Sequence, residues 1–114
     1  MLYFLSVDIG GTKTLCELST GDNEVILEQS FASAHYVSFD DVLSEFLANE
    51  QISSLSIESA CFAIAGPVLR RKGSVTNLPW QLDADDLAAK FDIRYIHLCN
   101  DFEAVAHGIA CLAE

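Results

Sequence analysis

One stretch near the start of the chain combines a carboxylate, a glycine turn and hydroxyl groups. It follows an apolar run and reads Asp8-Ile9-Gly10-Gly11-Thr12-Lys13-Thr14. Without Cβ atoms, Gly10 and Gly11 allow backbone N–H groups to approach phosphate oxygens, and threonine hydroxyls can add donors. Asp8 can orient a hydrated Mg²⁺ that bridges phosphates. The alternative is a plain turn in which Asp8 caps local backbone groups, because Asp favours turns for local reasons.

The carboxylate of Asp8 is unusual for its position. It follows an apolar run that we expect to form the first strand of a sheet. An ionised group in an apolar setting is costly unless something compensates it. A phosphate and metal site beside the strand would give Asp8 such a partner.

Two further stretches carry polar groups beside apolar runs. Asn100 and Asp101 follow an apolar segment, at the edge where open α/β sheets place ligands. Asp101 can alternatively be no more than a helix N-cap. Asn77 and Trp80 flank Pro79 in a stiff loop, where they can present an amide and an aromatic face to a polar ligand. For Trp80 we favour an anchor against the core.

Composition excludes several classes of function. The formal net charge is −11 and only 6 Lys and Arg are present, so nucleic acid is not an expected partner. No basic segment precedes the first apolar run and no run reaches membrane-spanning length, so we expect a cytoplasmic protein without a membrane partner. The cysteines form no C-x-x-C pair or Cys/His metal pattern, and we interpret them as reduced core residues. His97, in the middle of an apolar strand, is expected to be a core or edge histidine.

The elements that position these residues follow from periodicity and turn signals. Strands are expected at 2–7, 14–18, 25–31, 59–65 and 95–99, and a hairpin at 68–75. Helices are expected after the N-caps Ser38 and Asp83, and from 101 to 112. The order of the main elements is βββαβαβα, which predicts an α/β fold with a mixed five-stranded sheet and flanking helices.

Nucleotide-binding motifs of two familiar kinds are missing from this order. There is no G-x-G-x-x-G opening a helix and no G-x-x-x-x-G-K-[ST] loop. The glycine turn leads instead into a second strand, so a helix dipole does not contribute to it.

Taken together, four segments resemble the bacterial glucokinases and the related repressor, open-reading-frame and kinase (ROK) family. They occur in the family's order and spacing: Asp8-Ile9-Gly10-Gly11-Thr12-Lys13-Thr14, Ala63-Ile64-Ala65-Gly66-Pro67-Val68, Thr76-Asn77-Leu78-Pro79-Trp80 and Asn100-Asp101-Phe102-Glu103-Ala104-Val105-Ala106. The resemblance implies the actin-like ATPase fold with a ribonuclease H-like core. It also implies transfer of a phosphoryl group from Mg-ATP to the 6-hydroxyl of glucose or a similar hexose.

The resemblance also implies roles for individual residues. Asp101 would be the catalytic base, and Asn100 and Asn77 would bind the sugar. The phosphate loop of the ATP site would comprise Gly10, Gly11, Thr12, Lys13 and Thr14. Asp8 would lie near the metal.

By this resemblance, residues 1–114 correspond to a single amino-terminal small lobe, without the larger carboxyl-terminal lobe of a glucokinase. Half a cleft cannot surround a transition state, so we expect the isolated chain to be inactive. Apolar surface left by the other lobe predicts a homo-oligomer. The alternative function is a non-catalytic sugar-binding or interaction module with a kinase-like fold. A ROK-type repressor would need a DNA-binding helix-turn-helix, which we do not find before the first strand.

Overall fold

A meander of three strands begins the fold. The structure is a computed structural model that describes residues 2–100. β1 (Tyr3–Ile9), β2 (Lys13–Thr20) and β3 (Val25–Ala32) are joined by tight turns and pair antiparallel in sequence order. The meander expected from the glycine-containing turns is therefore confirmed.

Two parallel strands complete the main sheet. β4 (Ile57–Ile64) lies parallel to β1, and β8 (Tyr95–Asn100) lies parallel to β4, which gives the order β3-β2-β1-β4-β8. This is the predicted mixed five-stranded sheet. Because β1, β4 and β8 run in the same direction, their carboxyl ends meet at one edge of the sheet. The chain segments that follow them are thereby brought together.

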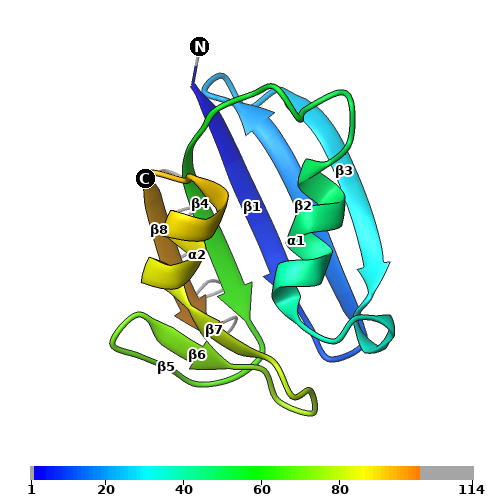
Figure 1. Cartoon of the computed structure of the whole chain (residues 1–114), viewed down its shortest axis with the longest axis vertical. Coiled ribbons are helices and arrows are strands. Elements are labelled where there is room, and N and C mark those ends of the chain that lie inside the picture. The colour runs from blue at the N-terminus through cyan, green and yellow to red at the C-terminus, as the bar shows by residue number, and fades with distance from the viewer. Residues whose placement is uncertain (1, 101–114) are drawn as a thin grey trace.

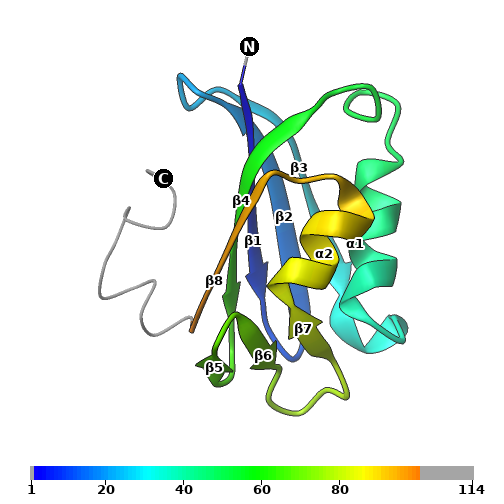
Figure 2. The same ribbon diagram turned by 60° about the vertical axis from the view of Figure 1, so that its left-hand side comes forward.

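Two helices cover one face of the sheet (Figures 1 and 2). α1 (Phe39–Leu47) begins at Ser38, whose hydroxyl accepts the backbone N–H of Asp41. α2 (Ala84–Phe91) begins at Asp83, whose carboxylate accepts the N–H groups of the two residues after Ala84. Both predicted N-caps are confirmed, and each satisfies donors that a helix leaves without an internal partner. A 3-10 turn, η1 (Ser33–His35), joins β3 to α1.

The core lies between this face and the helices. Alternate residues of β1 point into it, and Leu5, Val7 and Ile9 are all buried. The largest fully buried side chains are Trp80, Phe39, Phe46 and Phe62. No helix within residues 2–100 has the length and apolar character needed to cross a membrane.

A second, smaller sheet lies at the edge where β1 and β4 end (Figure 1). It consists of β5 (Val68–Leu69), β6 (Lys72–Ser74) and β7 (Gln81–Asp83), paired antiparallel in this order. The hairpin expected over 68–75 is confirmed, whereas β7 was not predicted. The carbonyl group of Trp80, just before β7, accepts a hydrogen bond from the N–H of Val75, which closes the loop between β6 and β7.

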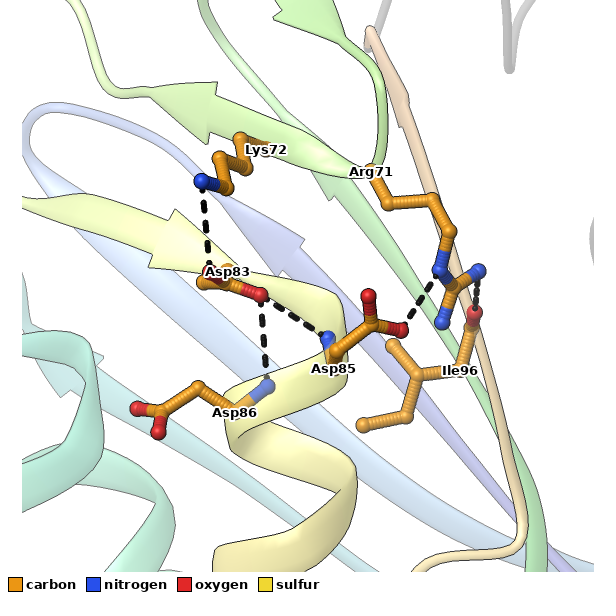
Figure 3. Close-up of polar contacts among 6 residues, drawn as sticks. All are labelled: Arg71, Lys72, Asp83, Asp85, Asp86 and Ile96. Carbon is orange, nitrogen blue, oxygen red and sulfur yellow. Dashed lines mark hydrogen bonds and ion pairs between the residues drawn. The ribbon is translucent and has the colours of Figure 1, made fainter.

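Ionic contacts join the small sheet to α2 and β8 (Figure 3). The Arg71 guanidinium donates to the carboxylate of Asp85 and to the carbonyl oxygen of Ile96, both at 2.9 Å. Lys72 lies 3.8 Å from the Asp83 carboxylate that caps α2. The β5–β6 turn thus holds the start of α2 and the edge strand in one arrangement. The helix expected from 101 to 112 lies outside the described residues.

Candidate functional site

The candidate site is built from loops at the carboxyl ends of the parallel strands. The loop after β4 is held to β1 by a hydrogen bond from the Ala65 N–H to the carbonyl of Ile9, at 3.0 Å. Thr76 then donates its N–H to the carbonyl of Ala65, at 2.8 Å. These bonds bring residues of three separate motifs to one edge of the sheet.

The glycine turn after β1 fits closely against its surroundings. The N–H of Gly10 donates to the carbonyl of Lys13 at 3.0 Å, and a Cβ on Gly10 would lie 3.1 Å from that same oxygen. A Cβ on Gly11 would lie 3.3 Å from the carbonyl oxygen of Thr76. Close backbone packing therefore gives these positions a structural reason to be glycine, besides the phosphate approach inferred from the sequence.

The residues assigned to the phosphate loop separate into two groups. Thr12 and Lys13 are exposed, and Lys13 has no carboxylate within ion-pair distance among residues 2–100. Thr14 is fully buried and its hydroxyl lies 2.9 Å from that of Ser33. Ser33 was not identified from the sequence, where the segment Ser33-Ala34-His35 carries no recognisable motif. The hydroxyl of Thr14 therefore faces the interior, while Thr12 and Lys13 face outward.

Asp8 is exposed, on the sheet face opposite the helices. The expectation that its carboxylate lies in an apolar setting was wrong, because the strand alternates and only Val7 and Ile9 beside it are buried. Residues 2–100 contain no cluster of three or more His, Cys, Asp or Glu able to hold a metal. A lone exposed carboxylate near the glycine turn nevertheless suits Mg²⁺, which keeps several waters and takes few ligands from protein.

The two predicted sugar ligands occupy different parts of this edge. Asn100 ends β8, and its amide nitrogen donates to the carbonyl of Gly66 at 2.6 Å. Asn77 is exposed, in the left-handed region at φ 69°, and its Cβ lies within 4 Å of the Cβ position of Gly11. The structure therefore places Asn77 against the glycine turn and Asn100 against the loop after β4. Asp101, the predicted base, lies outside the described residues.

Trp80 is the anchor that we favoured. It is buried, its ring lies 6.1 Å from that of Phe39 between centroids, and its indole N–H donates to the carbonyl of Tyr36. His97 is exposed on the edge strand β8, in agreement with an edge histidine. Trp80 therefore fixes the loop between β6 and β7 to the core, and His97 on β8 lies outside the loops described above.

Three groups outside the loops of the site have shifted pKa values, one in the core and two in exposed pairs. Burial raises the pKa of Cys16, on the core side of β2, to about 12. The pKa of the Tyr36 phenol is raised because it donates to the carboxylate of Glu45, at 2.9 Å. The pKa of Lys90 is raised because its ammonium donates to Asp40, a contact that joins α2 to α1.

Comparison with known proteins gives this geometry a context. The family model described as Glucokinase matches residues 5–114. A glucokinase of Nostoc punctiforme is 41% identical over 118 residues, which cover 98% of this chain and 33% of that protein. The chain thus spans about a third of the length of the curated relatives it matches.

Solved structures share the fold. The crystal structure of a glucokinase from an Antarctic psychrotroph is similar with a TM-score of 0.81 and 27% identity, over 94% of this chain and 34% of that one. A ROK family glucokinase from Streptomyces griseus, in complex with glucose and AMPPNP, is similar with a TM-score of 0.67 and 18% identity, over 98% of this chain and 37% of that one. The actin-like sugar kinase fold is thereby confirmed.

Proposed function

The chain belongs to the glucokinase family, and on that basis we propose that it forms one wall of a site that transfers a phosphoryl group from ATP to glucose. The observation that carries this proposal is the convergence of the Gly10–Thr12 turn, Asn77 and Asn100 at one edge of the sheet. Open α/β folds bind ligands at this edge. The glucose and AMPPNP bound to the Streptomyces griseus relative are consistent with the two ligands.

The residues of this wall divide between the two substrates. The N–H groups of Gly11 and Thr12 and the ammonium of Lys13 would bind phosphate oxygens. Asn100 and Asn77 would bind sugar hydroxyls, and Asp101 would take the proton of the 6-hydroxyl as the new bond forms. Asp8 would hold Mg²⁺ through water, and the ion would supply neutralisation of the phosphate charge. Phosphoryl transfer depends chiefly on such positioning and electrostatic stabilisation.

The proposal also requires protein groups on the other side of the substrates. Catalysis by positioning requires groups on both sides of the reacting atoms. We place them in a second, larger lobe, like the remaining two thirds of the relatives, or in a second copy of the chain. ATP and hexoses meet in the cytoplasm, where we place the protein.

A chimera tests whether this chain supplies a competent wall. Residues 1–114 replace the matching segment of the Nostoc punctiforme glucokinase, with which they share 41% identity. We expect ADP release from Mg-ATP that depends on glucose. The Asp101→Asn chimera should be slower by about 100-fold or more, since a positioned base contributes about that much. The 114-residue chain alone, measured in parallel, should show no turnover.

Three outcomes would contradict the proposal. A chimera with native circular dichroism but no glucose-dependent ADP release would show that the wall is not competent. An Asp101→Asn chimera as fast as its parent would remove Asp101 as the base. Saturable glucose binding by the folded chimera without ADP release would favour the non-catalytic sugar-binding module.

A further inference from the structure

A buried chain of hydroxyl groups lies directly beneath the Gly10–Thr12 turn. The Thr14 and Ser33 side chains are both fully buried, and their hydroxyl oxygens are 2.9 Å apart. The Ser33 hydroxyl also donates to the carbonyl oxygen of Gly10, at 2.8 Å. A hydroxyl has one proton, so Ser33 donates to Gly10 and must accept from Thr14. The direction of the chain is therefore fixed from Thr14 through Ser33 to Gly10.

Backbone bonds extend this chain to the rest of the turn. The N–H of Ser33 donates to the carbonyl of Thr12 at 3.0 Å, and the N–H of Gly10 donates to the carbonyl of Lys13 at 3.0 Å. The carbonyl groups of Gly10 and Thr12 are thus both held by one residue of η1. Within residues 2–100, the N–H groups of Gly11 and Thr12 have no such backbone partner. Two carbonyl groups of the turn are therefore held by η1, whereas two of its N–H groups have no backbone partner in the described part of the chain.

We propose that Thr14 and Ser33 are positioning residues that hold the Gly10–Thr12 turn in the shape that binds phosphate. This inference rests on the proposed function, because it concerns the same phosphate site. It replaces a direct role of the Thr14 hydroxyl in binding phosphate with an indirect one. A carbonyl released from Ser33 is free to turn outward, where its oxygen would repel phosphate oxygens and displace the donors.

The test compares variants of the 114-residue chain by NMR. Ser33→Ala and Thr14→Val each break the hydroxyl chain, whereas Thr14→Ser keeps it and should behave as wild type. Thr20→Val is the matched control, since Thr20 is also a buried threonine on β2 but its hydroxyl accepts N–H groups at the far end of the strand. Circular dichroism confirms that each variant is folded.

The first readout is amide hydrogen exchange at Gly10 and Ser33, whose N–H groups donate to the carbonyl groups of Lys13 and Thr12. We expect exchange about tenfold faster in Ser33→Ala and Thr14→Val, corresponding to the loss of one net hydrogen bond. The second readout is the shift of the Gly11 and Thr12 amide signals on titration with Mg-ATP to millimolar concentrations. We expect about tenfold weaker binding in the same two variants, and wild-type behaviour in Thr14→Ser and Thr20→Val.

The results separate this inference from the proposed function. Unchanged exchange in both broken variants would overturn the positioning role. A second result would be faster exchange in the variants together with no shift of the wild-type Gly11 and Thr12 amide signals on addition of Mg-ATP. It would overturn the link to phosphate binding, and Thr14 and Ser33 would then have a structural role only. If Thr20→Val accelerated amide exchange at Gly10 and Ser33 as much as Ser33→Ala and Thr14→Val do, the effect would be a general loss of stability. That result would also overturn the inference. Failure of the proposed function itself is read separately, from ADP release by the chimera.

Discussion

At the scale of single residues, the Cys16 thiol makes the stability of the fold depend on alkaline pH. The side chain is buried on the core side of β2, and burial raises its pKa from 9.0 to about 12. The unfolded chain releases this proton at lower pH than the folded chain does. The free energy of unfolding therefore loses a contribution as the pH rises from about 9 towards 12, and this contribution is fully present below pH 9.

Urea unfolding of the wild type and of Cys16→Ala between pH 7 and 11 measures this effect. Other groups titrate in both proteins, so the difference between the two isolates the thiol. Above pH 9 we expect the wild type to lose up to about 1.4 kcal/mol per pH unit more than Cys16→Ala, the slope for one proton. If the free energy of unfolding changed with pH in the same way in both proteins, the thiol would have the same pKa in the folded and unfolded chains, which would contradict the prediction.

At the scale of elements, Gly66 sets how closely β4 and the small sheet approach each other. A Cβ at this position would overlap the carbonyl oxygen of Ser74 at the end of β6, and backbone cannot move away as a side-chain tip can. We expect Gly66→Ala to lower the free energy of unfolding by about 2 kcal/mol or more, the effect of forcing atoms into a packed site. The change in urea midpoint measures it.

Gly21→Ala provides the matched control for this substitution. Gly21 lies in the turn between β2 and β3, where a Cβ would meet only the ring of Phe4 at 3.5 Å, an ordinary contact. Gly21→Ala should leave the free energy of unfolding unchanged or raise it by about 0.5 kcal/mol, since alanine restricts the unfolded chain. Equal effects of the two substitutions would contradict the close approach at Gly66.

The main elements could be predicted from the sequence because each carries a local signal. Ser38 and Asp83 cap the two helices as their side chains indicate, and alternation or apolar runs identify the strands of the main sheet. β7 was missed because it has only three residues, too few for a periodic pattern. Alternation along β1 places Asp8 on the opposite face from Val7 and Ile9, so the exposure of Asp8 could also be predicted from the sequence.

The site could be predicted only in part, because its geometry depends on distant contacts. The turn signal identifies Gly10 and Gly11, but nothing local indicates that Thr76 and Asn77 pack against them. That contact exists because the chain returns through the small sheet. Ser33 was missed for the same reason, since its bonds reach Gly10 and Thr12 across more than twenty positions in the sequence.

At the scale of the whole molecule, negative charge is in excess. The formal net charge is −11, and four of the six cations are already within ion-pair distance of a carboxylate. Exposed pairs of this kind contribute little to stability, whereas a large net charge opposes the compact state through self-repulsion. The remaining repulsion has one identifiable local source in the main sheet. Glu17 on β2 lies directly opposite Glu28 on the edge strand β3.

Glu28→Lys separates this local repulsion from the general effect of net charge. It turns a like-charge cross-strand pair into an opposite-charge pair, while Glu50→Lys makes the same change in net charge at an exposed turn after α1. At low salt we expect Glu28→Lys to raise the free energy of unfolding by about 0.5 kcal/mol more than Glu50→Lys, within the range for cross-strand charge pairs. Urea unfolding at ~0.05 M and ~1 M NaCl measures both. The difference should shrink at high salt, because the Debye length falls to about 3 Å. Equal stabilisation by both variants would assign the effect to net charge alone, and the repulsion would then be a property of the whole surface and not of this pair.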